Sequence, residues 1–242
     1  MIEVKNLTKK FSKNFIAVND TSWVAPDGAI TGFIGPNGAG KTTTLSMITG
    51  SLKPDNGEIL LNGIDIMKKP IEAKMQFGFV SDSPDHFLRL KGIEYLNFMA
   101  DVYGVDTKTR TDFIENYSKR FGLFDALNNT ILSYSHGMRQ KMMVLGCLIH
   151  NPKIWLLDEP LLGLDPQSAF ELKQMMREHC DKGNSVLFST HVLEVAEKLC
   201  DRIIIIKHGV IQFTGTLTEL KDQYPGEDLE NIFLKITGDN NE

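Results

Sequence analysis

A run of residues near the N-terminus has the types and spacing needed to hold a phosphate group. The run consists of Gly35, Pro36, Asn37, Gly38, Ala39, Gly40, Lys41, Thr42 and Thr43, and it fits the P-loop pattern G-x-x-x-x-G-K-[ST]. Its glycines allow a tight turn whose backbone N–H groups approach an anion with no Cβ in the way. Lys41 is expected to reach the β- and γ-phosphates of a nucleotide, and the Thr42 hydroxyl is expected to bind Mg²⁺.

The segments on either side of this motif match what phosphate binding requires. Residues 29–34 are apolar and rich in β-branched side chains, which predicts a buried strand. Residues 44–48 contain no helix breaker and predict the first turns of a helix. Strand, glycine loop and helix in this order direct the positive end of the helix at the anion. A plain glycine-rich turn is the alternative, and these flanking elements argue against it.

A second pair of chemically capable residues follows another predicted strand, residues 154–157. Asp158 would hold Mg²⁺, directly or through water. Glu159 would act as the general base on an attacking water, or at least orient that water. An Asp-Glu pair at a strand end is often only the start of a solvated loop. The phosphate-binding motif upstream favours the catalytic interpretation.

Composition limits the class of protein. The chain has 242 residues, 42% of them hydrophobic and 24% charged, with a net charge of −5. It is long enough for one large domain or two joined lobes. No basic stripe is visible, so nucleic acid is not expected as a partner. The cysteines, Cys147, Cys180 and Cys200, lack metal-site spacing and are expected to be small buried hydrophobic residues in a reducing cytosol.

Neither a leader nor a membrane span is expected. Residues 1–5 already have the pattern of a strand rather than that of a signal peptide. The longest tight apolar cluster is residues 203–206, far short of the ~18 apolar residues that a spanning helix needs. If the protein works at a membrane, another chain must supply the spans.

The order of the predicted elements gives the fold class. The first thirty residues predict an antiparallel β layer, and Asn62-Gly63 predicts a hairpin turn. Residues 92–150 have a helical pattern, whereas strands and helices alternate again after residue 152. We therefore predict an α/β fold: a P-loop NTPase (RecA-like) core with an antiparallel β layer and an inserted helical subdomain.

Further motifs, all in the expected order, resemble those of the ATP-binding cassette (ABC) family. The signature motif of that family resembles residues 134–140, its D-loop resembles Leu164-Asp165, and residues 189–191 end in a switch histidine, His191. Phe11 lies where the family usually places an aromatic ring that stacks on adenine. The resemblance covers roughly residues 1–220. Residues 228–234 and the form of the signature resemble the bacterial drug and peptide exporter branch, the ABC-2 type.

The resemblance implies a division of the chain and a set of site residues. The nucleotide-binding domain would span residues 1–220, with a core of 1–83 and 151–220, a helical subdomain of 84–150 and a C-terminal tail of 221–242. ATP and Mg²⁺ would be the ligands. The catalytic residues would be Lys41, Glu159 and His191, and the metal ligands Thr42, Asp82 and Asp158. The other five histidines are interpreted as structural.

The resemblance also implies that one copy of the chain cannot complete the reaction. Two cassettes would stack head to tail, and Ser135 and the backbone N–H of Gly137 would face the γ-phosphate bound by the partner. The partners would be a second ABC ATPase subunit, identical or different, and a transmembrane permease docked on the helical lobe. The protein would then be cytoplasmic and peripheral on the inner face of the cell membrane.

Three positions depart from the family pattern. Asp82 stands where the family usually has glutamine; it can still hold Mg²⁺ or water, but it adds negative charge near the phosphates. His136 replaces a glycine of the signature and brings a titratable ring near the partner's nucleotide. Phe11 replaces the commoner tyrosine, which costs little because stacking uses the ring face.

Three functions remain open from the sequence. The first is the ATPase subunit of an exporter, and the second is a soluble ABC-family ATPase that acts in assembly or regulation without a permease. The third is an ordinary P-loop kinase, against which the signature and the switch histidine count. Relatives in DNA repair need a long coiled-coil insertion and those in translation need two cassettes in one chain, so neither fits.

Overall fold

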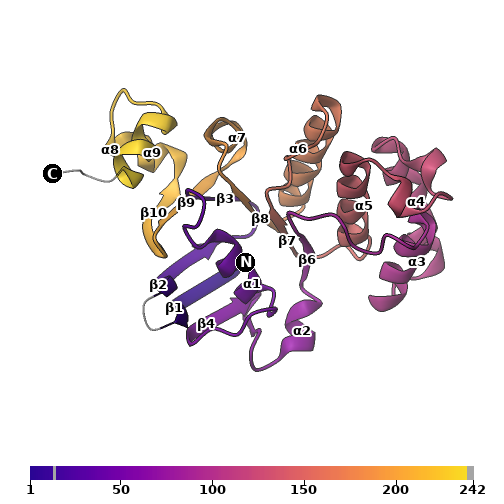
Figure 1. The fold of residues 1–242 in the computed structure, drawn as a ribbon, viewed down its shortest axis with the longest axis horizontal. Helices are drawn as coiled ribbons and strands as arrows, with labels where there is room; N and C mark the ends of the chain where they lie inside the picture. The colour runs from indigo at the N-terminus through magenta and orange to yellow at the C-terminus, as the bar shows by residue number, and fades with distance from the viewer. Residues whose placement is uncertain (13–14, 239–242) are drawn as a thin grey trace.

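The fold is organised around a central six-stranded sheet with the strand order β10-β9-β3-β8-β7-β6 (Figure 1). The computed structural model describes residues 1–12 and 15–238. Strands β9, β3, β8, β7 and β6 run parallel, and β10 joins the edge antiparallel to β9. The strands span β3 Ile30–Ile34, β6 Phe77–Val80, β7 Ile154–Asp158, β8 Ser185–Thr190, β9 Arg202–Lys207 and β10 Val210–Thr216.

Both faces of the parallel strands are buried, which explains why they are almost continuously apolar. In β7, Trp155 and Leu157 point into one hydrophobic cluster, whereas Ile154 and Leu156 point into another on the opposite face. The isoleucines of β9 alternate in the same way. Because successive side chains of a strand point to opposite faces, each strand supplies both clusters.

A second, antiparallel sheet has the order β2-β1-β4-β5 and lies beside the first. Its strands span β1 Ile2–Ser12, β2 Phe15–Ala25, β4 Asn56–Leu61 and β5 Ile64–Asp65. Helix α1, Lys41–Ile48, contributes Leu45 and Met47 to the cluster shared by the two sheets. The phosphate-binding loop therefore leads into a helix that is packed against both sheets.

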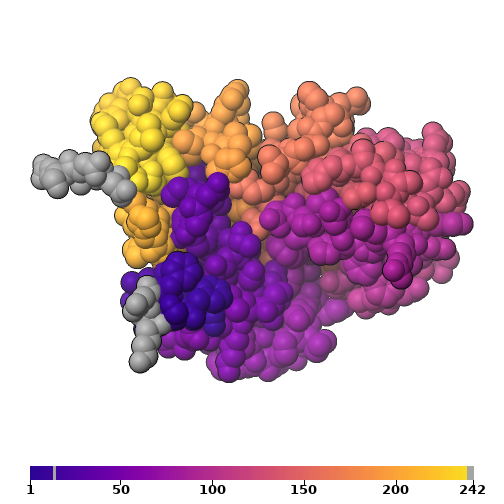
Figure 2. All heavy atoms as spheres, in the orientation of Figure 1, coloured from indigo at the N-terminus to yellow at the C-terminus, as the bar shows by residue number. Residues whose placement is uncertain are grey.

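Helices inserted between β6 and β7 form one end of the molecule, coloured magenta to rose in Figures 1 and 2. They are α3 Gly92–Val102, α4 Thr107–Arg120 and α5 His136–Leu148, with single 3₁₀ turns at Phe124–Ala126 and Ile131–Ser133. Asp106 caps α4 and Ser135 caps α5 through their side chains. The structure thus confirms the predicted α/β fold with a P-loop core, an antiparallel layer and a helical insertion.

The remaining helices are α2 Pro70–Lys74, α6 Pro166–Asp181, α7 Leu193–Leu199, α8 Leu217–Gln223 and α9 Leu229–Thr237. The predicted C-terminal tail, residues 221–242, contains α9, which contacts α7. The end of that tail, residues 239–242, lies outside the described residues. Helices α2 and α8 were not anticipated.

All three cysteines are free and buried, as predicted. In the described part of the chain, no helix has the length and apolarity needed to cross a bilayer.

Candidate active site

The P-loop is held in a conformation that only glycine adopts easily. Gly40, the residue before α1, has φ 110°. A methyl group there would lie 2.5 Å from the backbone oxygen of Ala17, and one on Gly35 would lie 2.4 Å from that of Ile206. Strands β2 and β9 therefore approach the loop too closely for any side chain at these two positions.

Lys41 is the most deeply buried cation of this loop, with 7% of its surface exposed. Its Nζ donates hydrogen bonds to the backbone oxygens of Gly35 at 2.7 Å and Pro36 at 3.2 Å. Burial lowers the pKa of Lys41, and the carboxylates of Glu159 and Asp158 act in the opposite direction. The ammonium group is thus fixed over the loop, where a bound phosphate would meet it.

Asp158 lies at the end of β7, only 2% exposed, and both of its carboxylate oxygens are hydrogen-bonded. One accepts a bond from the Thr42 hydroxyl at 3.1 Å and the other accepts a bond from the Ser189 hydroxyl. Burial raises the pKa of Asp158, while these two hydrogen bonds oppose the rise. The carboxylate and the Thr42 hydroxyl together offer the hard oxygen ligands that Mg²⁺ prefers.

Ser189 is a member of the site that the sequence reading missed. It pairs with Asp158 across β7 and β8, and its Oγ also accepts a hydrogen bond from the Glu159 backbone N–H at 3.1 Å. One serine therefore positions both acidic residues. The available signal was a polar residue at the carboxyl end of a strand that is otherwise apolar, next to the strand bearing the acids.

Glu159 has φ 47°, a left-handed conformation that is strained for a residue with a side chain. Such strain costs on the order of 1–3 kcal/mol and persists where the surroundings enforce it. The Glu159 carboxylate pairs with Nδ1 of His191 at 2.9 Å. The Glu159 side chain is 17% exposed and that of His191 47%, so the imidazole lies on the solvent side of the pair.

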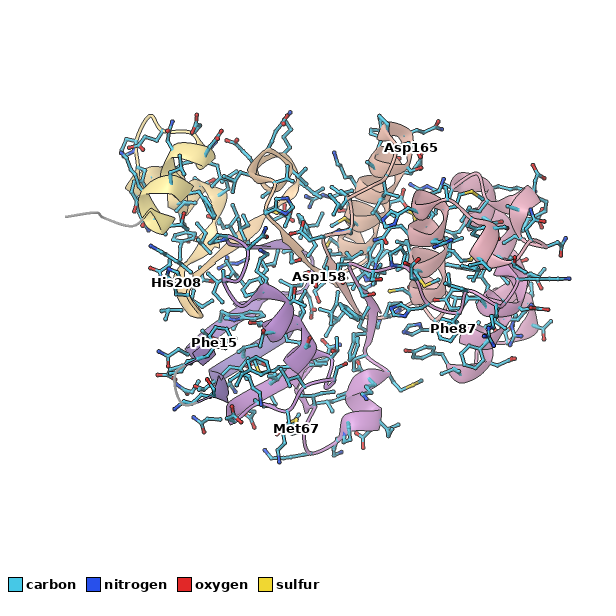
Figure 3. The ribbon with its side chains drawn as sticks, viewed as in Figure 1. Phe15, Met67, Phe87, Asp158, Asp165 and His208 are labelled. Carbon is cyan, nitrogen blue, oxygen red and sulfur yellow. The ribbon has the colours of Figure 1, made fainter. Side chains whose placement is uncertain are left out.

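Lys41, Thr42, Asp158 and Glu159 line one cavity of about 350 Å³. Its walls are Phe15, Ala17, Asn37, Gly38, Gly40, Lys41, Thr42, Thr43, Asp82, Asp158 and Glu159. Asp82, predicted as a metal ligand, lies in this wall, and its charge contributes to raising the pKa of Asp158. In Figure 3 Asp158 lies at the centre of the molecule, between the sheets and the helical insertion. A larger cavity, about 440 Å³, lies between α4 and α6 and contains none of the predicted site residues.

The aromatic wall of the cavity is Phe15 rather than Phe11. Phe11, at the end of β1, lies behind it, with ring centroids 6.1 Å apart. Both rings are largely exposed, as an adenine platform must be before the nucleotide binds. The sequence reading missed Phe15 because which ring of this hairpin faces the loop depends on the β1–β2 register, and that register contains several shifts.

The signature residues lie apart from this cavity. Ser135 is exposed, and its Oγ accepts a hydrogen bond from the Met138 N–H at 3.3 Å, which caps α5. Neither Ser135 nor Gly137 lines the cavity that contains the P-loop. The structure therefore brings the P-loop, Asp158, Glu159 and His191 together, and leaves Ser135 and His136 of the signature exposed on the insertion.

Comparison with known proteins identifies the family. Residues 18–162 match the family model described as ABC transporter. This chain belongs to the ABC transporter family. The ABC transporter ATP-binding protein NatA of Bacillus subtilis is 35% identical over 97% of this chain and 97% of its own length. The linearmycin resistance ATP-binding protein LnrL of the same organism is 33% identical over 99% of this chain and 76% of its own.

A solved structure agrees. An ATP-binding subunit of an ABC transporter superposes with a TM-score of 0.93 and 31% identity, covering 98% of this chain and 99% of that one. The cassette is thus an ABC ATPase, the ATP-binding subunit of a transporter. The signature and switch histidine had counted against a P-loop kinase, and membership of this family agrees.

Proposed function

We propose that this chain hydrolyses ATP with Mg²⁺ as one half of a head-to-tail pair of cassettes, which powers a transmembrane exporter. The observation that carries the proposal is the separation of two half-sites in one chain. The P-loop, Asp158 and Glu159 line one cavity, and His191 is bonded to Glu159, whereas Ser135 and Gly137 do not line that cavity. A second copy, or a related cassette, would bring its own signature to the open side of the cavity.

Each step of the proposed hydrolysis has a candidate group in the structure. Lys41 and the loop N–H groups bind and neutralise the phosphates, and the Phe15 and Phe11 rings offer stacking surfaces for adenine. Thr42 and Asp158 would hold Mg²⁺, which when bound draws charge off the phosphate oxygens. Asp82 would bind the ion or its water.

Glu159 accepts the proton of the attacking water, or orients that water. His191, bonded to Glu159, fixes the carboxylate and is placed to donate to the γ-phosphate. The α5 N-terminus supplies the groups needed in trans. The helix has 13 residues, and Ser135, His136 and Gly137 form its exposed or half-exposed first turn. Backbone N–H groups and a hydroxyl at this end favour a phosphate supplied by another chain.

An apolar surface on the helical insertion supports docking of a permease. Phe87 and Phe98 are each 46% exposed, and their ring centroids lie 5.8 Å apart. Val102, one turn beyond Phe98 on α3, is also exposed. Phe87, labelled in Figure 3, follows the cavity residue Asp82 by five residues. A partner that covers Phe87 would therefore contact a segment directly connected to the nucleotide cleft. We propose that a cytoplasmic loop of the permease covers them, which would hold this chain at the inner face of the membrane.

The export direction is supported by two resemblances. The signature form and residues 228–234 match the exporter branch, and the relative LnrL is named for antibiotic resistance. Residues 228–234 form the cap and first turns of α9, with Leu229 and Ile232 buried. The transported compound would be selected by the permease.

The pairing is tested with Glu159→Gln, which removes the base and keeps the side-chain shape. We expect hydrolysis to fall by about 10²–10⁴, because the proton acceptor is lost. With ATP and Mg²⁺ the variant should then accumulate as a dimer, measured by light scattering, while ADP leaves it monomeric. Hydrolysis at the wild-type rate would overturn the role of Glu159. A variant that stays monomeric with ATP would overturn the homodimer, and adding candidate partner cassettes would test the heterodimer.

Docking is tested by purification from gently solubilised membranes. A polytopic membrane protein in fixed ratio is expected with the wild-type chain, and it should be lost with Phe87→Asp/Phe98→Asp while ATP binding remains. Recovery of the wild-type chain from the cytosol alone would favour the second function, an ATPase that acts in assembly or regulation without a permease.

A further inference from the structure

The first turn of α5 packs directly on the loop that follows Glu159. A methyl group on Gly163 would lie 2.7 Å from Cδ2 and 3.1 Å from Nε2 of the His136 ring. A methyl group on Gly137 would lie 3.2 Å from the backbone oxygen of Gly163. The His136 ring therefore fills the space where a side chain of residue 163 would begin, although Gly163 is otherwise exposed.

Gly163 belongs to a short loop with little freedom of its own. The loop starts at Glu159, whose backbone oxygen accepts a hydrogen bond from Leu162 N–H at 3.2 Å. It ends at Asp165, which caps α6 by accepting bonds from the Ser168 N–H and hydroxyl at 2.9 and 2.6 Å. Gly163 itself has φ 77°. With both ends fixed, a shift of Gly163 must be taken up by the strained backbone at Glu159 or by the start of α6.

We propose that His136 is a positioning residue that holds the Glu159 loop from the signature turn. The proposal rests on the proposed function, because the same turn faces the partner's phosphates in the paired state. Movement of the α5 N-terminus when it engages the partner's ATP would pass through the His136 ring to Gly163 and Glu159. One nucleotide site would thereby adjust the general base of the other.

The ABC signature usually has glycine at position 136, and a glycine there could not contact Gly163. A glycine would leave the face of Gly163 uncovered, and residues 160–164 would lose their packing partner on this side. Glutamine has a flat polar end of similar reach and would cover Gly163 again. These two substitutions therefore separate the contact from the mere presence of a histidine.

The experiment compares His136→Gly, His136→Gln and His208→Gly in the full chain. His208 is an exposed histidine in the β9–β10 turn with φ 47°, which glycine accepts, and Figure 3 shows it on the opposite side of the molecule from Asp165. Amide hydrogen exchange of residues 160–164 is measured without nucleotide, and kcat and KM for ATP are measured with Mg²⁺.

For His136→Gly we expect about tenfold faster exchange at residues 160–164 and about tenfold lower kcat, with KM within about twofold. His136→Gln should restore both values, and His208→Gly should leave both as in wild type. Unchanged exchange in His136→Gly would overturn the proposal. A rise in KM with unchanged kcat would also overturn it, because His136 would then act on the nucleotide itself.

A double-substitution cycle adds a readout that does not depend on hydrolysis. Gly163→Ala carries the same backbone strain in every background, but its methyl group meets the His136 ring only when that ring is present. The loss of melting temperature should therefore be several degrees smaller in the His136→Gly background. Equal losses would overturn the contact. Failure of Glu159→Gln to pair with any cassette would overturn the proposed function alone, since exchange and melting are measured on the single chain.

Discussion

The P-loop and the first turn of α5 are both glycine-containing turns at helix N-termini, yet the fold treats them differently. At the P-loop, Gly40 has a left-handed φ and touches the β2 backbone, and the neighbouring Lys41 is almost fully buried. At α5, the φ of Gly137 is not left-handed, and Ser135 and His136 are exposed. The chain thus holds the P-loop in a closely packed conformation and leaves the first turn of α5, the proposed half-site for a partner's phosphate, open on its surface.

The same contrast holds for the aspartates. Asp158 is buried and bonded to side chains from α1 and β8, whereas the side chain of the exposed Asp165 accepts hydrogen bonds from Ser168 at the start of its own helix. A buried polar group that lacks a hydrogen-bond partner destabilises the folded state, because it has lost its hydrogen bonds to water. We therefore expect substitutions to have large effects in the first region and small ones in the second.

The largest contrast is between Gly40→Ala and Gly137→Ala. Gly40→Ala should destabilise the chain by about 2–4 kcal/mol and abolish ATP binding, because the methyl group meets the Ala17 backbone and the φ is unfavourable. Gly137→Ala should change stability by at most about 1 kcal/mol, since its φ is ordinary for the helix and its methyl group would lie 3.2 Å from the Gly163 backbone oxygen, against 2.5 Å for the contact at Gly40. Urea unfolding and titration with a fluorescent ATP analogue measure both. Equal losses would contradict the contrast.

The next contrast is between Asp158→Asn and Asp165→Asn. Asp158→Asn should lower hydrolysis by on the order of 10², because the carboxylate beside Thr42 is lost. Asp165→Asn should change stability by less than about 0.5 kcal/mol, because asparagine caps helices about as well as aspartate. Phosphate release and thermal unfolding give the two readouts. A hundredfold loss of hydrolysis in Asp165→Asn as well would show that the loop cap is part of the catalytic machinery.

Asp158 also gives the nucleotide-free protein a pH dependence. Burial raises the pKa of Asp158 above 3.8. Between pH 3.8 and that raised pKa, the folded chain therefore binds more protons at this site than the unfolded chain does. The stabilising contribution is present below pH 3.8 and is lost as the pH rises through the raised pKa. The free energy of unfolding of wild type minus that of Asp158→Asn should therefore fall as pH rises above 4. A difference that rises instead would mean that the two hydrogen bonds outweigh burial.

A smaller effect is expected from Ser135→Ala. It removes the cap of α5 and should cost about 1 kcal/mol of stability. ATP binding by the single chain should be unchanged, whereas ATP-driven pairing of the Glu159→Gln chain should weaken. Ser135→Thr keeps a capping hydroxyl and serves as the control. Loss of ATP binding by the single chain would mean that the signature belongs to its own nucleotide site after all.

The smallest effect separates the two phenylalanines. Phe15→Ala should weaken ATP binding by about 1 kcal/mol, roughly fivefold, because Phe15 lines the cavity. Phe11→Ala should act less, through loss of its packing against Phe15. Titration with ATP and with inorganic triphosphate measures whether the effect depends on the base. A larger loss for Phe11→Ala would restore Phe11 as the adenine platform.

The sequence was most informative where local rules decide. The P-loop, its strand and its helix follow from glycine spacing and from apolar runs on either side, because a tight turn between a buried strand and a helix depends on residues close in sequence. The position of Asp158 at a strand end follows from the same reasoning. The functional roles given to Lys41, Asp82 and His191 remain predictions, and the structure adds that Asp82 lines the cavity and that His191 bonds to Glu159.

Short elements were harder to predict. Helix α2 has five residues and α8 has seven, too few turns for a hydrophobic period to stand out. Contacts distant in sequence help to hold them; α8, for example, buries Leu220 completely and is linked to α7 by the Lys221–Glu197 pair at 2.7 Å.

By itself, the sequence determined the fold class and the family of this protein, and it predicted the P-loop residues as the phosphate-binding segment. These follow from glycine positions, strand periodicity and the order of motifs. The tertiary structure alone decided that Ser189 joins Asp158 to the Glu159 backbone, that Phe15 lines the cavity, and that His136 covers Gly163. Each of these contacts joins elements far apart in the chain or depends on a strand register. Their geometry is set by how sheets and helices pack, which spacing along the sequence does not encode.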